Sequence, residues 1–74
     1  MDVAIVFREK DDGRIEASMR AGPGWDVSAA ALKLGGGGHP RAAGCTVVGK
    51  MNAVQERVLK EVEASLLEQA QARH

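Results

Sequence analysis

The chain has 74 residues, ten of them basic and ten acidic, so its formal net charge is zero. This length predicts one small domain, and the balanced charge excludes a chain drawn to nucleic acid by overall attraction alone. Phe7 and Trp25 are the only aromatic residues, so the core must be built from aliphatic side chains. Such a thin core favours a domain that packs against another part of a longer protein or against a second copy.

Cys45 is the single cysteine, so no disulfide can form within the chain. We expect it to be a small buried residue at the start of a strand, and a lone thiol fits a reducing cytoplasm. No apolar run approaches the roughly 20 residues of a membrane span, and the first residues lack the basic lead of a signal peptide. The expected location is therefore the cytoplasm, with no membrane partner.

The first part of the chain predicts two antiparallel strands joined by a tight turn. Residues 2–8 form a short apolar run that is typical of a strand buried on both faces. Asp12-Gly13 is a hairpin signal, because both residues tolerate the positive φ that tight turns need. Residues 14–20 then alternate between polar and apolar side chains, which predicts the second strand.

A short helix and a third strand are expected next. Residues 22–24 break the sheet, and Asp26 or Ser28 can cap a helix over residues 27–34. Gly35 then fits the left-handed residue that commonly follows a helix. After the glycine run, residues 45–48 predict the third strand.

One long helix is expected from Asn52 to about Ala72. Asn52 and Gln55 have the spacing of a capping box. An apolar stripe recurs every four residues and is joined by Leu59 and Leu67; its members are Val54, Val58, Val62, Leu66 and Ala70. The whole order predicts an α+β fold over residues 1–74, with a small mixed sheet, one short helix and one long C-terminal helix.

Four consecutive glycines, Gly35, Gly36, Gly37 and Gly38, form the first candidate for a binding site. Glycine lets backbone N–H groups turn towards an anion and lets a ligand approach without Cβ collisions. The run lacks the Lys-Ser/Thr of a Walker A loop and does not join a strand to a helix, which also excludes a dinucleotide fingerprint. The alternative is a flexible turn, for which two glycines would suffice.

Four side chains complete the predicted substrate-binding set. His39 can donate to a phosphate oxygen or exchange a proton near neutral pH, and Arg41 adds a fixed charge. Arg20 ends the second strand on the polar face it shares with Ser18, where a guanidinium suits bidentate phosphate recognition. The alternatives are a structural hydrogen bond for His39 and surface ion pairs or solvation for the arginines. No carboxylate pair or ligand cluster accompanies His39, so we expect neither a catalytic residue nor a metal site in this chain.

The stretch GGGGHPRAAG resembles the signature of the DHHA1 domain, the C-terminal module of the DHH phosphoesterase superfamily. Upstream, residues 18–20 resemble the Ser-x-Arg of that domain's preceding strand. The resemblance extends from Val3 to the last helix and is greatest to the branch of bifunctional oligoribonucleases and pAp phosphatases. RecJ-like single-strand exonucleases and cyclic-dinucleotide phosphodiesterases carry related motifs and stay open as alternatives.

This resemblance implies a division of labour between two domains. A separate N-terminal DHH domain would hold Mn²⁺, and this domain would hold short RNA or a pAp-like nucleotide across a cleft. Gly35 to His39 would cradle phosphate, with His39 directed towards the scissile group, and Arg20 would bind phosphate or base. Arg41 inherits no role from the family pattern and is retained on its charge and position alone.

The resemblance also implies that the chain is a fragment of a longer phosphoesterase, binding weakly and catalysing nothing alone. An exposed sheet edge would favour a homodimer. A function of another class also stays open: a non-catalytic oligomerisation module in which the apolar stripe of the long helix joins copies. The alternative use of that stripe is ordinary packing on the sheet.

Overall fold

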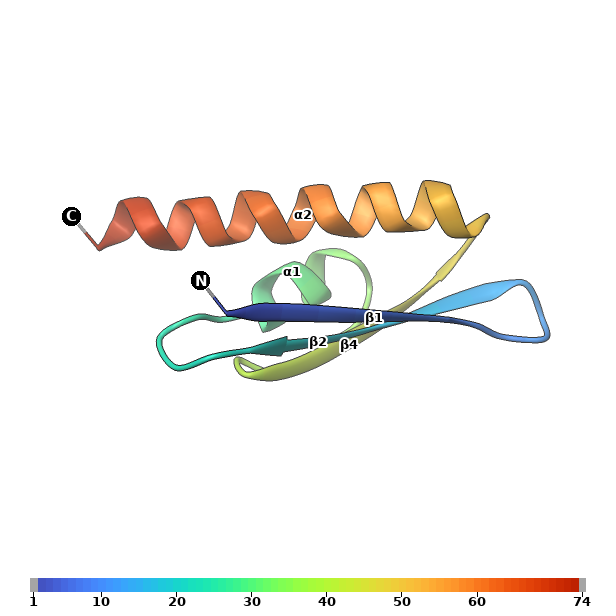
Figure 1. Ribbon diagram of the computed structural model, residues 1–74, viewed down its shortest axis with the longest axis horizontal. Helices are drawn as coiled ribbons and strands as arrows, with labels where there is room; N and C mark the ends of the chain where they lie inside the picture. Colours follow the sequence, from blue (N-terminus) through green and yellow to red (C-terminus); the bar gives the residue numbers. More distant parts are fainter. Residues whose placement is uncertain (1, 74) are drawn as a thin grey trace.

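The computed structural model describes residues 2–73, which form a four-stranded sheet with both helices on one face (Figure 1). In chain order the elements are β1 (Val3–Glu9), β2 (Arg14–Ala21), α1 (Ser28–Lys33), β3 (Gly37–His39), β4 (Ala42–Val48) and α2 (Met51–Ala72). The α+β class, with one short and one long helix, is confirmed.

The sheet differs from the expectation in one detail, because it is antiparallel throughout instead of mixed. The strand order is β1-β2-β4-β3, and each neighbouring pair runs antiparallel. The connection through α1 leads to the far edge of the sheet, and the β3–β4 hairpin then brings β4 back between β2 and β3. As a result β4 runs opposite to both of its neighbours.

β1 is an edge strand, so the prediction of a strand buried on both faces is wrong. It pairs with β2, and its side chains alternate between half-buried and exposed. Val6, paired with Ser18, is 66% exposed because it lies on the face of the sheet that the helices leave uncovered. The predicted turn at Gly13 is confirmed, with a φ of 81°.

β3 is the element that the sequence pattern did not indicate. Gly37–His39 pair with β4, and a two-residue turn, Pro40 and Arg41, joins them to a strand that begins at Ala42 instead of Cys45. Glycine and alanine are poor strand formers, so their pairing here depends on tertiary packing rather than on propensity. Cys45 is buried as expected, but it lies within β4 and not at its start.

The core lies between the helices and one face of the sheet. The predicted stripe of α2 packs there: Val54, Val58, Val62 and Leu66 are buried. Leu59 and Leu67, which were expected to join the stripe, are instead 44% and 59% exposed.

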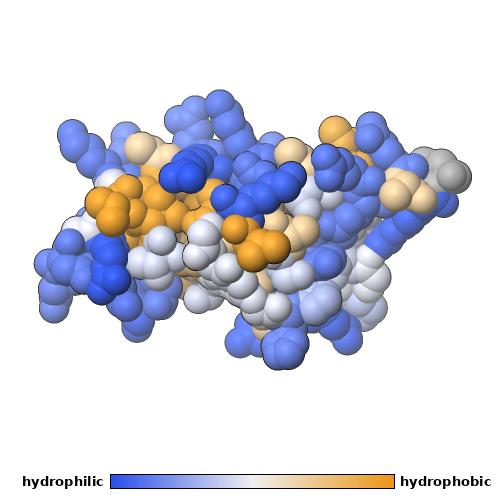
Figure 2. Space-filling view, turned by 180° about the vertical axis from the view of Figure 1, so that it is seen from behind, coloured by the Kyte–Doolittle hydropathy of each residue, from blue (hydrophilic) through white to orange (hydrophobic). Residues whose placement is uncertain are grey.

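Seen from behind, an apolar patch lies among hydrophilic side chains on the half that carries the β1–β2 turn (Figure 2). Such exposed apolar surface agrees with the thin core expected from the composition.

The helix ends match the sequence expectations in part. Gly35 follows α1 with a φ of 86°, as expected for the residue after a helix. Asp26 Oδ1 accepts a hydrogen bond of 2.7 Å from the backbone N–H of Ser28, the first residue of α1, but the N-cap is Val27, so neither Asp26 nor Ser28 is the expected cap. The predicted capping box is wrong, because α2 begins at Met51 and its N-cap is Lys50 in extended conformation, without a side-chain cap.

Candidate functional site

The strand register places two predicted site residues in one row across the sheet. Arg20 on β2 lies opposite Ala42 on β4, and Ala42 in turn lies opposite His39 on β3. Directly opposed residues of antiparallel strands carry their side chains on the same face. At about 4.8 Å between strands, the Cα atoms of Arg20 and His39 lie about 10 Å apart. Both side chains are exposed on the face opposite the helices, which we call the open face.

A second row, formed by Ser18, Gly44 and Gly37, lies next to the first on the open face. Two adjoining depressions follow the rows, with volumes of about 330 and 290 Å³, and Ser18 and Gly44 line both. We call the two depressions together the trough. Beside larger residues such as Glu16 and Thr46, several residues with little or no side chain line it, so that a ligand can approach the backbone of β3 and β4; they include Gly37, Ala42 and Gly44.

The four glycines differ in whether the backbone conformation or the packing requires a residue without a Cβ. Gly35 ends α1, and Gly38 has a φ of 137° and would place a Cβ 2.7 Å from the carbonyl oxygen of Ala42. A Cβ on Gly36 would lie 2.0 Å from the carbonyl oxygen of Gly44. At Gly37 an added Cβ meets nothing within 4 Å, and its φ is not positive. Gly37 is therefore the one glycine of the run that neither backbone conformation nor packing requires.

Three cationic or protonatable side chains gather at one end of the open face. Arg41 lies in the β3–β4 turn, where its carbonyl oxygen accepts a hydrogen bond of 3.0 Å from the N–H of Ala21, the residue after Arg20. Within residues 2–73, the side chains of Arg20, His39 and Arg41 form none of the ion pairs or side-chain hydrogen bonds. Their donors are available to an anion.

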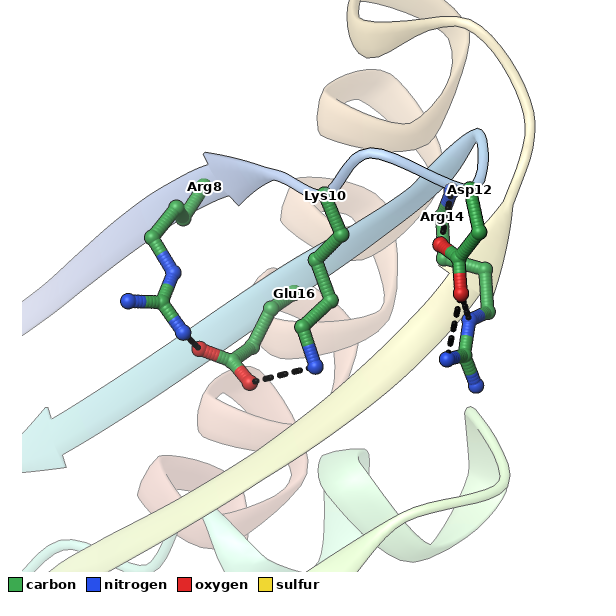
Figure 3. Close-up of polar contacts among 5 residues, drawn as sticks. All are labelled: Arg8, Lys10, Asp12, Arg14 and Glu16. Atoms are coloured by element: carbon green, nitrogen blue, oxygen red, sulfur yellow. Dashed lines mark hydrogen bonds and ion pairs between the residues drawn. The ribbon is translucent and has the colours of Figure 1, made fainter.

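The charges at the other end of the same face pair with one another. Glu16 lies between Arg8 and Lys10, with N–O distances of 3.1 and 3.7 Å (Figure 3). Asp12 accepts a hydrogen bond of 2.6 Å from Arg14 Nε, and this bond lowers the pKa of the Asp12 carboxyl group. Each basic side chain named at this end thus has an acidic partner, whereas Arg20 and Arg41 form no ion pair within residues 2–73.

The structure thus brings part of the predicted set together and adds two residues that sequence reasoning did not place in the site. Gly38 lies outside it, because it pairs with Ala43 in the row that faces the core, and Arg41 lies in the adjoining turn. Ser18, Arg20, Gly37 and His39 share the open face, and Gly35 and Gly36 line the trough at its edge. The two added residues, Ala42 and Gly44, line it between β2 and β3. Ala42 and Gly44 are two positions apart, which places both on one face of a strand. This signal could be used only if the strand were known to begin at Ala42.

The described part of the chain offers neither a metal centre nor a membrane span. Residues 2–73 contain no group of three His, Cys, Asp or Glu side chains placed to hold a metal ion. Over the same residues, neither helix has the length and the apolar character needed to cross a bilayer.

Comparison with known proteins shows which family this chain is similar to. A family model described as the DHHA1 domain matches residues 1–68. The bifunctional oligoribonuclease and PAP phosphatase NrnA of Thermus thermophilus is 40% identical to this chain over 65 residues. The aligned region covers 86% of this chain but 20% of the relative, so the chain spans about a fifth of that protein's length.

Proposed function

The chain belongs to the DHHA1 domain family, and from this premise we propose that it is the nucleotide-binding domain of a DHH-family phosphoesterase. Its proposed substrates are short RNA and pAp-like nucleotides, the substrate classes named for the Thermus relative. The observation that carries this proposal is the row formed by Arg20, Ala42 and His39 beside an uncovered trough.

The geometry of the row suits a phosphate bound above Ala42. Arg20 reaches such a group from one side with a planar fork of donors, and His39 reaches it from the other side. Between them Ala42 is small, and Gly37 leaves the trough open to the sugar-phosphate backbone. Ser18 adds a hydroxyl in the next row. The row supplies donors and positive charge for an anion, although Glu16 lines the far end of the trough and Asp2 lines a depression beside Arg20.

Cleavage of a phosphoester needs groups that this domain does not supply. Residues 2–73 do not fit a metal centre, because they lack a cluster of ligands. We propose that a separate DHH domain holds Mn²⁺, which would activate the attacking water and offset charge on the phosphate. The role left to this chain is to bind the substrate and orient it towards that domain.

Two other types of phosphoesterase are alternatives for the longer protein to which this domain would belong. A RecJ-like exonuclease or a cyclic-dinucleotide phosphodiesterase would use the same phosphate-binding row, and the name of the Thermus relative favours short RNA and pAp over both.

An oligomerisation module built on the α2 stripe is disfavoured, because Val54, Val58, Val62 and Leu66 are buried against the sheet. Pairing of two copies would use another surface, such as the edge strands β1 and β3. The free thiol of Cys45 agrees with the proposed cytoplasmic setting.

A ligand series tests the proposal. Calorimetric titration of the chain with pApA, pAp, cyclic di-AMP and the phosphate-free nucleoside adenosine separates phosphate recognition from base recognition. We expect pApA and pAp to bind at least about tenfold more tightly than adenosine, because a hydrogen bond between charged groups contributes about 1.5–3 kcal/mol. Equal affinity for pAp and adenosine would contradict a phosphate site, and a preference for cyclic di-AMP would reassign the substrate.

A further inference from the structure

Gln69, near the C-terminal end of α2, joins that helix to the loop before α1. Its Oε1 accepts a hydrogen bond of 2.9 Å from the backbone N–H of Asp26, and its Nε2 donates one of 2.7 Å to the carbonyl oxygen of Asp26. Nε2 also lies 3.2 Å from Oγ of the buried Ser65, one turn earlier on the helix. The side-chain amide therefore pairs with both backbone groups of Asp26, as a neighbouring strand would.

The residue after Asp26 holds the turn that carries part of the candidate site. The N–H of Val27, which is fully buried, donates a hydrogen bond of 2.8 Å to the carbonyl oxygen of Pro40. Pro40 lies between His39 and Arg41 in the β3–β4 turn. The C-terminal half of α2, the loop after β2 and this turn all lie at the same end of the molecule (Figure 1).

The turn thus has two backbone tethers of different origin. One comes from Ala21, which continues the strand that carries Arg20. The other comes from Val27, whose segment follows the loop of Gly22 to Gly24 and is attached to α2 through Gln69. Glycine-rich loops constrain their ends weakly. Val27 is held by its burial in the core and by this attachment to α2, and the turn to which it donates depends on both.

We propose that Gln69 is a positioning residue for the nucleotide site, acting through Asp26 and Val27 on the turn that carries His39 and Arg41. The proposal rests on the proposed function, because it assigns Gln69 the task of setting the distance between His39 and Arg20. Gln69 does not touch the ligand. Its two hydrogen bonds with Asp26 act on the β3–β4 turn beside the trough, while Ser18 and Arg20 on β2 are held independently by sheet pairing.

The test uses a double-mutant cycle on the 74-residue chain with pApA as the probe. Gln69→Leu removes both hydrogen bonds at nearly constant volume, and Gln69→Glu retains an acceptor for the Asp26 N–H but loses the donor. Gln71→Leu, at an exposed position of the same helix, is the matched control. Each is combined with His39→Ala and, separately, with Ser18→Ala, and binding is measured at a temperature where circular dichroism shows every variant fully folded.

We expect Gln69→Leu to weaken pApA binding by roughly three- to thirtyfold, the usual range for residues that modulate a site without touching its ligand. Gln69→Glu should give an intermediate loss, and Gln71→Leu should give none. The distinguishing result is non-additivity: His39→Ala should cost much less in the Gln69→Leu background than in the wild type, whereas Ser18→Ala should cost the same in both. Independent effects of Gln69 and His39, multiplying to within about twofold, would overturn the proposal.

A second measurement tests the positioning role of Gln69 without depending on nucleotide binding. If the wild-type chain binds no pApA, the proposed function fails, and the positioning claim is decided by amide hydrogen exchange without ligand. Gln69→Leu should then speed exchange of the Val27 amide at least roughly tenfold relative to Gln71→Leu, since that amide donates to Pro40. The amides of β2 should be unaffected. Unchanged exchange at Val27 would overturn the positioning role.

Discussion

Arg20 and His39 face the same side of the sheet, in one row, with only the methyl group of Ala42 between them. They come from strands that are not neighbours and are 19 positions apart in the sequence. The small residue between them makes room for an anion that both side chains can reach. The site is therefore a product of strand order, because β4 inserts between the two strands that carry the donors.

Arg20→Gln should weaken binding of pApA by about 10- to 100-fold, because a charged donor to phosphate is lost. Arg14→Gln is the matched control, since Arg14 lies on the same face of the same strand but pairs with Asp12. Calorimetric titration at two salt concentrations measures both effects. Similar losses for the two variants would mean that general positive charge, and not the row, attracts the nucleotide.

Gly37→Ala should separate folding from binding. An added Cβ meets nothing within 4 Å and the φ is not positive, so the free energy of unfolding should change by less than about 1 kcal/mol. The methyl group nevertheless enters the trough and should weaken pApA binding. Urea unfolding and calorimetric titration check the two halves of this prediction, and unchanged affinity would show that the ligand does not approach β3.

Gly36→Ala, unlike Gly37→Ala, should lower the free energy of unfolding. Its Cβ would lie 2.0 Å from the carbonyl oxygen of Gly44 and 2.7 Å from Cα of Cys45, so β4 or the loop must shift. Overpacking of this kind costs about 1–3 kcal/mol. The measurement is again urea unfolding, with Gly37→Ala as the control. A variant as stable as the wild type would mean that the loop does not pack on β4 as described.

Leu66→Ala and Leu67→Ala test which face of α2 is covered. Leu66 is 5% exposed and its truncation should cost about 2–5 kcal/mol, whereas Leu67 is 59% exposed and its truncation should change stability by less than about 0.5 kcal/mol. Thermal or urea unfolding of the two variants compares neighbouring leucines in one helix. A reversed order would mean that the helix is rotated on the sheet or that its exposed side joins copies.

Cys45 gives a pH prediction. Burial raises the pKa of its thiol above the ordinary value, against a weaker lowering effect of the Arg57 charge. The folded chain therefore holds the thiol proton at a pH where the unfolded chain, with a pKa of about 8.5, has lost it. This contribution to stability is complete below that pH and declines as the pH rises above it. Cys45→Ala should flatten the pH profile of the unfolding free energy above about pH 8.5, and parallel profiles would contradict this.

The sequence predicted best those features that depend on local pattern. The alternation of residues 14–20 identified β2 and its polar face, and the four-residue repeat of Val54, Val58 and Val62 identified the buried side of α2. The turn at Gly13 followed from backbone preference alone. In each case the residues themselves carry the periodicity or the φ that the structure uses.

Features that depend on strand order could not be predicted in this way. β3 consists of two glycines and a histidine, and it is a strand because β4 pairs with it, not because its residues favour extension. The edge position of β1 likewise depends on which strand occupies the centre, so its apolar run was misinterpreted as buried on both faces. For the same reason Gly44 and Ala42 entered the site only when the register was known.

An NMR titration of the ¹⁵N-labelled chain with pApA would show whether the open face binds the phosphates of a nucleotide. Binding there predicts saturable shifts at the amides of two adjacent rows and none at Leu59 and Leu67 on the helix face; the residues of the rows are Ser18, Arg20, Gly37, His39 and Gly44. Saturable shifts on α2 with none on β2, β3 and β4, or no shifts at millimolar pApA, would contradict it.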